Sequence, residues 1–225
     1  MKFHSVAIDG PAGAGKSTLA RRAAKELGFL YVDTGAIYRT VALKMIHEQV
    51  DVSQPSQVAP HLKELDIRMD YDASGEQRMF LDGADVSDAI REHRVSDLTS
   101  QVAVLKEVRA FLLELQRKMA REHNVIMDGR DIGTVVLPAA DVKIFLTASP
   151  EARAKRRVLE LENRGQIADF DVVLHDIIDR DERDRSRPIA PLCRAEDAFL
   201  LDTTELNFTE SLEALLSLIK ENLSL

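Results

Sequence analysis

The residues with the clearest chemical potential lie near the start of the chain, where three glycines lead into a lysine and a serine. Residues 10–17 read Gly-Pro-Ala-Gly-Ala-Gly-Lys-Ser and match the pattern G-x-x-x-x-G-K-[ST]. Glycines let backbone N–H groups turn inward around phosphate oxygens, a lysine reaches the β- and γ-phosphates, and a hydroxyl can ligate Mg²⁺. We therefore expect this loop to bind ATP, with Mg²⁺ on Ser17. The residues assigned to ATP are Gly10, Pro11, Ala12, Gly13, Ala14, Gly15, Lys16, Ser17 and Thr18.

Two further segments place arginines beside carboxylates directly after runs expected to be strands. They are residues 33–39, with the sequence DTGAIYR, and residues 128–131, with the sequence DGRD. Because the carboxyl ends of parallel strands line one ligand crevice, we expect both segments to face the glycine loop. An arginine can hold a phosphate through two hydrogen bonds, and Asp128 resembles an acid that orders Mg²⁺ through water.

A third group of charges occupies residues 180–187, RDERDRSR. On a helix Arg180, Arg183 and Arg187 would share a face, with Asp184 one turn beyond Arg180, and Pro188 would end the run. Alternating charges of this kind also occur on solvated, salt-bridged helix faces. A third cationic segment nevertheless suits phosphoryl transfer, because donor and acceptor phosphates must be neutralised as they approach. The candidate catalytic residues are Lys16, Arg130, Arg180, Arg183 and Arg185.

Short apolar runs and helical patterns alternate along the chain. The runs predicted to be buried strands are residues 3–8, 29–32, 125–127, 142–146 and 198–201. The predicted helices are residues 17–27, 104–119 and 149–165. The glycine loop falls between the first strand and the first helix, which is the context that the motif requires. This alternation predicts an α/β fold of the P-loop type, with a five-stranded parallel sheet and helices on both faces.

Residues 33–124 separate the second predicted strand from the third, whereas a crossover between parallel strands needs only roughly a dozen residues. The excess is predicted to form an additional lobe. Within it, residues 65–71 alternate apolar and charged side chains, and residues 78–81 return after a turn at residues 72–75. Asp82-Gly83 makes a second turn. The pattern predicts a small, half-buried antiparallel meander.

Composition narrows the classes of protein to which the chain can belong. Hydrophobic residues make up 45% and charged residues 30% of the 225 residues, as in soluble globular proteins. The sequence has no apolar run of about 18 residues for a membrane span, and its first apolar stretch is too short for a signal peptide. The single Cys193 fits a reducing compartment, so we expect a cytoplasmic protein, monomeric by default. The net charge of −8, with three tyrosines and eight phenylalanines for stacking, disfavours nucleic-acid partners.

The loop alone does not name a reaction, because GTPases, motor ATPases and small-molecule kinases all use it. The guanine-reading motif Asn-Lys-x-Asp does not occur in the sequence. A monophosphate acceptor, with a second pKa of about 6, is already nucleophilic at neutral pH, so that Lys16, Mg²⁺ and arginines would suffice for catalysis. An alcohol acceptor would need a carboxylate beside its hydroxyl, for which Asp33 is the best candidate.

Four segments together resemble those of the bacterial cytidylate kinases: GPAGAGKST, DTGAIYR, DGRDIGTVVLP and RDERDRSRPIAPL. The resemblance covers nearly the whole chain, including the meander, which is similar to an insert in that family's monophosphate-binding lobe. It implies transfer of the γ-phosphoryl group of ATP to CMP or dCMP with Mg²⁺. It also implies one P-loop kinase domain (1–225), with a core at about 1–36, 98–157 and 170–225, a lobe at about 37–97 and a lid at about 158–169 around Arg164.

The resemblance further implies roles for residues on the acceptor side. The positions that match those holding the acceptor's phosphate and ribose are Thr34, Arg39, Arg130, Arg180 and Asp184. The positions that match those recognising cytosine are Ser100, Arg109, Asp131 and Arg187. A carboxylate such as Asp131 can accept from the exocyclic amine of cytosine, whereas Arg109 and Ser100 can donate to N3 and O2. Arg156 and Arg157 are candidates for ATP contacts, and Lys106 departs from the proline that many members carry there.

Two other functions fit the same sequence features. One is a kinase acting on UMP, AMP or a hydroxyl-bearing metabolite on the same scaffold. The other is a nucleotide-binding regulator without turnover, against which the three arginine-bearing segments argue. A nucleic-acid-stimulated ATPase fits less well. For a kinase, we also expect the lobe and lid to close over both substrates, because closure keeps water from the γ-phosphate.

Overall fold

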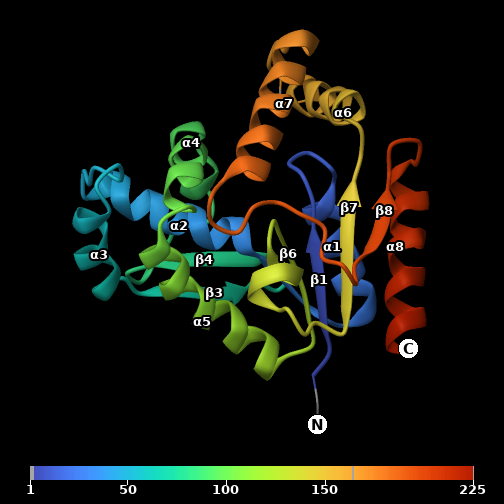
Figure 1. Cartoon of the computed structure of the whole chain (residues 1–225), viewed down its shortest axis with the longest axis horizontal. Coiled ribbons are helices and arrows are strands. Elements are labelled where there is room, and N and C mark those ends of the chain that lie inside the picture. The colour runs from blue at the N-terminus through green and yellow to red at the C-terminus, as the bar shows by residue number, and fades with distance from the viewer. Residues whose placement is uncertain (1–2, 164, 225) are drawn as a thin grey trace. The chain divides into compact units, whose positions relative to one another are not determined.

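Five parallel strands form the main sheet of the computed structural model, which describes residues 3–163 and 165–224. In chain order they are β1 (Ser5–Asp9), β2 (Leu30–Asp33), β6 (Val125–Gly129), β7 (Val142–Thr147) and β8 (Phe199–Asp202). In space they follow the order β2-β6-β1-β7-β8 (Figure 1). The strands lie where the apolar runs predicted them, so the predicted α/β fold is confirmed.

The central strand β1 is hydrogen-bonded to β6 on one side and to β7 on the other. Val6, Ala7 and Ile8 have no exposed surface, as expected for a parallel strand covered on both faces. In the pairing of β1 with β6, Asp9 lies opposite Gly129. The segments that follow these two strands therefore leave the sheet side by side at the same edge.

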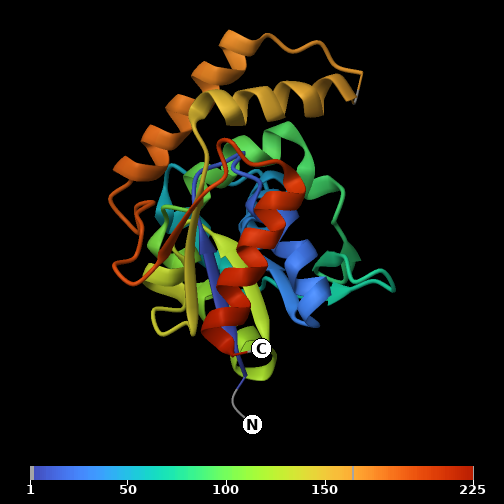
Figure 2. The same ribbon diagram turned by 90° about the vertical axis from the view of Figure 1, so that its right-hand side faces the viewer.

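Helices α1 (Lys16–Leu27) and α8 (Phe208–Leu223) pack against one face of this sheet (Figure 2). Their buried side chains include Leu19, Ala20, Ala23 and Ala24 of α1 and Leu212, Leu215 and Ile219 of α8. The start of α8 is fixed by reciprocal hydrogen bonds between Asn207 and Glu210, in which each side chain accepts from the other's backbone N–H. None of the described helices is long and apolar enough to cross a membrane.

The chain divides into two compact units, with the boundary inside β2. The first unit holds the described residues up to Tyr31 and from His123 onward, and the second holds Val32–Glu122. The second unit contains α2 (Thr34–His47), α3 (Pro55–Lys63), α4 (His93–Val102), α5 (Lys106–Glu122) and an antiparallel sheet of β3 (Ile67–Tyr71), β4 (Gln77–Leu81) and β5 (Ala84–Asp85). The predicted meander is therefore confirmed. Residues 32–36 and 98–122, assigned to the core from sequence, belong to this second unit, and the division into core, lobe and lid stays a prediction.

Helices α6 (Pro150–Asn163) and α7 (Phe170–Ser186) pack side by side in the first unit (Figures 1 and 2). Ser149 caps α6 by accepting a hydrogen bond from the backbone N–H of Ala152. The side chain of Asp169 caps α7 in the same way. The segment between the helices contains part of the predicted lid, of which Arg164 lies outside the described residues.

One prediction about α7 is wrong. The helix ends at Ser186, and Arg187 has φ −60° and ψ 138°, an extended conformation. A residue before proline is disfavoured in the helical conformation because its backbone clashes with the proline ring, and Pro188 follows here. Arg187 therefore leaves the helix and does not share a helical face with Arg180 and Arg183.

Candidate active site

The glycine loop joins β1 to α1 and turns through three residues with positive φ. Gly10, Gly13 and Gly15 have φ values of +152°, +75° and +89°, which residues with a side chain rarely adopt. Gly10 is also confined in space, because a Cβ built on it would lie 1.9 Å from the backbone carbonyl oxygen of Leu146 in β7. The loop therefore requires glycine at position 10 for its path as well as for its conformation.

Lys16, the first residue of α1, is a buried charge. Its side chain donates a hydrogen bond from Nζ to the carbonyl oxygen of Pro11 at 2.8 Å. Burial, and after it the positive charge of Arg130, lowers the pKa of Lys16 to about 7, although the carboxylates of Asp128 and Asp9 act in the opposite direction. Near neutral pH this lysine is therefore protonated in only part of the molecules, and a polyphosphate beside it would raise its pKa.

Asp128, at the end of β6, is held by two hydroxyl groups. Ser17 Oγ donates to Asp128 Oδ2 at 2.8 Å, and the Tyr31 hydroxyl donates to Asp128 Oδ1 at 2.9 Å. The carboxylate thus lies beside the hydroxyl that the motif assigns to Mg²⁺. The sequence pointed to Asp128 and Ser17 but not to Tyr31, whose signal is only its place in the neighbouring strand β2.

Asp9, the last residue of β1, is a buried carboxylate that sequence analysis did not single out. It accepts hydrogen bonds from the backbone N–H groups of Ile132 and Gly133, both at 2.7 Å. Burial raises the pKa of Asp9 to about 6, and the charge of Asp131 acts in the same direction. The contact anchors the π-helical turn Ile132–Val136, which directly follows Arg130 and Asp131, to the strand that leads into the glycine loop. An acid directly before the loop was the signal that could have identified it.

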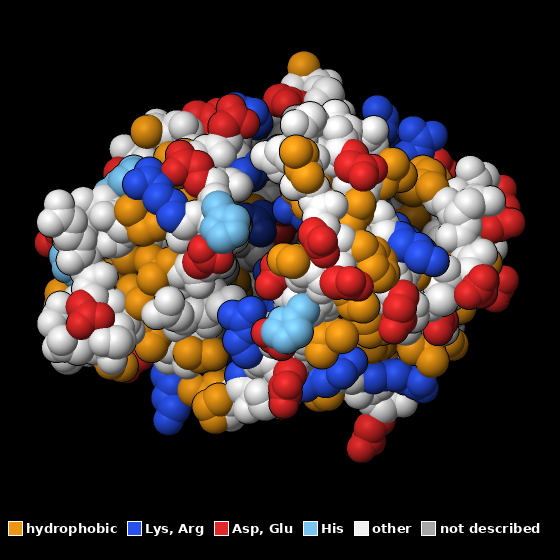
Figure 3. Space-filling model, turned by 90° about the horizontal axis from the view of Figure 1, so that it is seen from above, with side chains coloured by type: hydrophobic (Ala, Val, Ile, Leu, Met, Phe, Trp, Pro, Cys, Tyr) orange, Lys and Arg blue, Asp and Glu red, His pale blue; other side chains and the backbone are white. Residues whose placement is uncertain are grey.

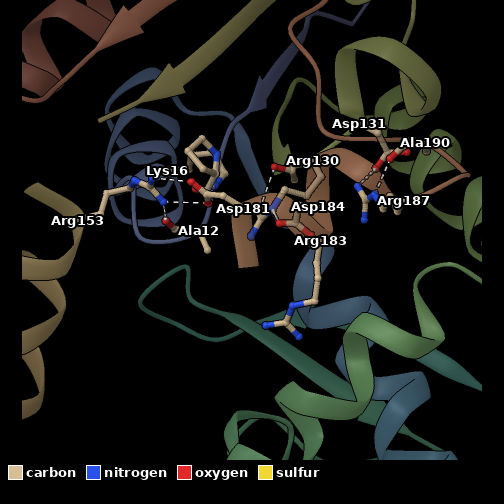
Figure 4. Close-up of polar contacts among 12 residues, drawn as sticks. Ala12, Lys16, Arg130, Asp131, Arg153, Asp181, Arg183, Asp184, Arg187 and Ala190 are labelled. Carbon is tan, nitrogen blue, oxygen red and sulfur yellow. Dashed lines mark hydrogen bonds and ion pairs between the residues drawn. The ribbon is translucent and has the colours of Figure 1, made fainter. Parts of the chain in front are cut away.

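Arg130 and Asp184 form an ion pair between the end of β6 and α7 (Figure 4). Arg130 Nε donates to Asp184 Oδ2 at 2.7 Å. Although burial favours the neutral acid, the positive charges of Arg130, Arg187 and Arg180 hold the pKa of Asp184 below its usual value. The structure thus brings together four residues that the sequence assigned to the acceptor.

Asp131 and Arg187 lie next to each other beside that pair (Figure 4). Arg187 Nη2 is 4.0 Å from Asp131 Oδ1, and Arg187 Nε donates to the carbonyl oxygen of Ala190 at 2.6 Å. Both side chains are largely buried. The extended conformation of Arg187 thus directs its guanidinium toward one of the residues with which it was predicted to read cytosine.

Arg183 and Arg185, the other two arginines of residues 180–187, have different surroundings. Arg183 is exposed, donates to the carbonyl oxygen of Asp179 at 3.3 Å, and points away from the Arg130–Asp184 pair in Figure 4. Arg185 lines a pocket of about 670 Å³ together with Ile178 and Asp181, which by their spacing lie on the same side of α7 as Arg185. The catalytic roles assigned to both residues stay predictions.

Four residues predicted for the acceptor belong to the second unit. Arg39 Nη2 donates to Asp33 Oδ2 at 2.9 Å, while Asp33 Oδ1 caps α2 by accepting from a backbone N–H. Arg109 donates to the carbonyl oxygen of Ala103 at 3.2 Å, and its guanidinium lies 6.0 Å from the centre of the Tyr38 ring. The remaining two are Thr34, which is buried at the start of α2, and Ser100, which is exposed on α4.

Arginines of α6 contact the backbone of the glycine loop. Arg156 Nη1 donates to the carbonyl oxygen of Ala14 at 3.4 Å and to the hydroxyl of Thr203 at 3.2 Å. Arg157 instead pairs with Glu160 at 2.8 Å on the surface of the helix. Arg153, which sequence analysis missed, donates to the carbonyl oxygen of Ala12 at 3.0 Å.

The parallel sheet, the glycine loop between β1 and α1, and the acid at the end of the adjacent β6 together define a P-loop nucleotide-binding protein. The fold matches a solved structure of an uncharacterized protein from Eubacterium ventriosum, with a TM-score of 0.51, 12% identity and 99% of each chain covered. The family model described as cytidylate kinase matches residues 6–221.

Relatives named cytidylate kinase are similar over most of their length. The relative from Desulfitobacterium hafniense is 48% identical over 216 residues, covering 96% of this chain and 92% of that one. The relative from Pelotomaculum thermopropionicum is 51% identical over 204 residues, covering 91% and 90%. The chain therefore belongs to the cytidylate kinase family, and the resemblance noted in the sequence is confirmed.

Replacing Gly10 by alanine should damage the loop more than a glycine replacement elsewhere. The new Cβ would meet the Leu146 carbonyl oxygen, so we expect Gly10→Ala to lower ATP affinity by at least about 10-fold and the free energy of unfolding by about 2 kcal/mol or more. The control is Gly28→Ala, because Gly28 has φ +68° but open space around its Cβ position. It should cost about 1 kcal/mol of stability and leave ATP binding unchanged. Equal effects on ATP binding would contradict the steric argument.

The lowered pKa of Lys16 predicts proton uptake when ATP binds. At pH 8, about nine tenths of a lysine with a pKa of about 7 is neutral, and the bound phosphates would raise that pKa and draw a proton from solution. Calorimetric titration at pH 8 in two buffers of different ionisation enthalpy should therefore show uptake approaching one proton. At pH 6 the lysine is already charged, so its contribution should be small. Absence of uptake at pH 8 would mean that Lys16 is fully charged in the free protein.

Proposed function

We propose that the protein transfers the γ-phosphoryl group of ATP to CMP or dCMP, giving ADP and CDP or dCDP. The observation that carries the proposal is the group of arginines and acids beside the glycine loop. Because β1 and β6 end opposite each other, at Asp9 and Gly129, the loop and Arg130 leave the sheet together. A donor phosphate in the loop and an acceptor phosphate on Arg130 would then be neighbours. Membership of the cytidylate kinase family supports the same reaction.

ATP occupies the glycine loop in this proposal. Residues 10–18 surround its phosphates and, apart from Pro11, offer backbone N–H groups to them. Lys16 binds the β- and γ-phosphates, and Arg156 contributes from α6. The residues also fit Mg²⁺, since the Ser17 hydroxyl and the Asp128 carboxylate are oxygen ligands 2.8 Å apart. Ser17 would ligate the ion directly and Asp128 would hold it through water. When bound, the ion neutralises charge on the β- and γ-phosphates.

The acceptor phosphate needs no general base, because at neutral pH it is already largely deprotonated. Catalysis then consists of holding two anions in line and stabilising the charge of the transferred group. We assign this stabilisation to Lys16 and to Arg130, Arg180, Arg183 and Arg185. The acceptor's phosphate and ribose are assigned to Thr34, Arg39, Arg130, Arg180 and Asp184.

Cytosine recognition is assigned to Ser100, Arg109, Asp131 and Arg187. Asp131 would accept a hydrogen bond from the exocyclic amine of cytosine. Uracil has a carbonyl at that position, which would leave the Asp131 carboxylate without its donor and cost roughly 1–3 kcal/mol. The buried position of Asp131 supports this assignment, because an unmet hydrogen bond is costly only where water cannot replace it.

A hydroxyl-bearing acceptor is supported less well. It would need Asp33 as a base, but the two carboxylate oxygens of Asp33 already accept hydrogen bonds from Arg39 and from the backbone of α2.

Acidic and basic side chains are interspersed over the face of the molecule drawn in Figure 3, which suits small anionic substrates better than a nucleic-acid backbone. We further infer a cytoplasmic monomer, with the exposed thiol of Cys193 kept reduced.

The identity of the acceptor nucleotide should determine the rate of ADP formation. In a coupled assay of ADP formation, kcat/KM for CMP and dCMP should exceed that for UMP and AMP by at least about 10-fold, as expected for a difference of 1.4 kcal/mol or more. ADP formation should require an acceptor. Equal use of all four monophosphates would contradict cytosine recognition, and ADP formation that ignores the acceptor would contradict the kinase assignment.

Asp131→Ala should weaken use of CMP without weakening ATP binding. Loss of the hydrogen bond to the cytosine amine should lower kcat/KM for CMP by roughly 10- to 100-fold and reduce the preference over UMP. ATP affinity should stay within about 3-fold, since Asp131 is not assigned to ATP. Asp176→Ala, which removes an exposed acid of α7, should change neither quantity. If Asp131→Ala lowered CMP use and ATP affinity equally, the role of Asp131 in base recognition would be excluded.

A further inference from the structure

Arg153 is a charged side chain buried where no sequence signal predicted one. It lies in the first turn of α6, is 1% exposed, and is the largest of the fully buried side chains among the described residues. A buried guanidinium is costly unless its N–H groups and its charge are matched by fixed partners. Its partners therefore identify the parts of the structure that depend on it.

Four hydrogen bonds fix the Arg153 guanidinium. Those to Ala12 and Asp181 can be followed in Figure 4. Nε donates to the carbonyl oxygen of Ala148 at 2.9 Å, just before α6. Nη1 donates to Ala12 in the glycine loop and to Asp181 Oδ1, both at 3.0 Å, and Nη2 donates to Asp181 Oδ2 at 2.6 Å. Because an arginine has five N–H donors, its hydrogen-bonding capacity is nearly used, and Arg153 holds protein groups rather than a phosphate.

Asp181 makes this arrangement relevant to the candidate active site. It lies in α7 next to Arg180 and three residues before Asp184, and it is buried. Asp184 is in turn held by Arg130 at the end of β6. The helix is thus attached at two points about one turn apart, by Arg153 beside the loop and by Arg130 beside the acceptor segment.

Stability alone does not account for such a pair. Replacing a buried ion pair by apolar residues of similar volume is often neutral or stabilising, because the cost of removing both charges from water disappears. What apolar residues cannot supply is the direction of a planar fork, which sets the distance and rotation of α7 against the carbonyl of Ala12. The feature that the ion pair adds is therefore orientation.

We propose that Arg153 is a positioning residue, which through Asp181 sets the arginine-bearing helix α7 in register with the glycine loop. This inference rests on the proposed phosphoryl transfer for its effect on rate. Arg153 contacts the loop backbone and α7, so its loss should misplace groups that act on the transferred phosphoryl and lower kcat. Ground-state binding of ATP should change little, because the contacts assigned to ATP lie outside α7. Binding of CMP should weaken together with kcat, because Arg180 and Asp184, which are assigned to the acceptor, belong to α7.

The test separates positioning from folding by means of a double variant. Arg153→Met alone leaves the Asp181 carboxylate buried without its partner and should lower both Tm and kcat. Arg153→Met combined with Asp181→Leu removes both charges, so Tm should return to within a few degrees of the starting protein. Its kcat should nevertheless stay at least about 30-fold lower, with KM for ATP within about 3-fold. Arg153→Lys, which keeps the charge but not the fork, should also lower kcat by about 10-fold or more.

A second measurement does not depend on turnover. Amide hydrogen exchange across residues 177–184 should slow when a non-hydrolysable ATP analogue with Mg²⁺ fills the loop of the starting protein, because Arg153 links the loop to α7. The double variant should bind the analogue and lose that protection. Arg22→Met, which removes an exposed pair with Glu26 in α1, should retain both the protection and kcat.

The outcomes distinguish this inference from the proposed function. Recovery of kcat to within about 3-fold in the folded double variant, or unchanged protection of α7, would reduce Arg153 to a structural role and overturn the inference. If the starting protein showed analogue-dependent protection, lost in the double variant, but no transfer to CMP, the positioning role would stand and the proposed function would fail.

Discussion

The burial of the Lys16 ammonium is the constraint on which the first unit depends. Burial disfavours the charged form of this lysine, whereas Asp9, Asp128 and Asp184 favour it by supplying negative charge from three separate segments. Each carboxylate is itself held, by backbone N–H groups at Asp9, by two hydroxyls at Asp128 and by Arg130 at Asp184. The charges of Lys16, Asp9, Asp128 and Asp184 therefore act on one another. Together they connect the glycine loop, the ends of β1 and β6, and α7.

Two acids of helix α7 each pair with an arginine near the glycine loop. Its acids Asp181 and Asp184 face two guanidinium groups from other elements, Arg153 and Arg130. Without these acids, the guanidinium groups of Arg153 and Arg130 would lose their opposite charges in a partly buried region, at a cost that rises as water is excluded. The alternation of sign in this helix, which in isolation reads as an ordinary solvated surface, thus organises a region of high positive charge.

The glycine loop and the five strands could be predicted because their signals are local, a fixed spacing in one case and uninterrupted apolar runs in the other. Asp9 and Arg153 could not, because their partners are distant in the chain: Ile132 is 123 residues from Asp9, and Asp181 is 28 residues from Arg153. The error at Arg187 arose differently, since helical spacing of the arginines was given more weight than the proline that follows. The roles of Ser100 and Arg109 rest on the family resemblance, because nothing in their spacing points to a nucleobase.

The hydrogen bond from Tyr31 to Asp128 has a spectroscopic consequence. The chain contains no tryptophan and three tyrosines, so its intrinsic ultraviolet emission comes from tyrosine, and one of these phenols donates to the acid proposed to hold Mg²⁺ through water. The electronic state of a phenol depends on whether its proton is shared with a carboxylate, and a cation arriving at that carboxylate competes for the same electron density. The protein thus carries a native chromophore joined to its proposed metal site, which can be followed optically without any label.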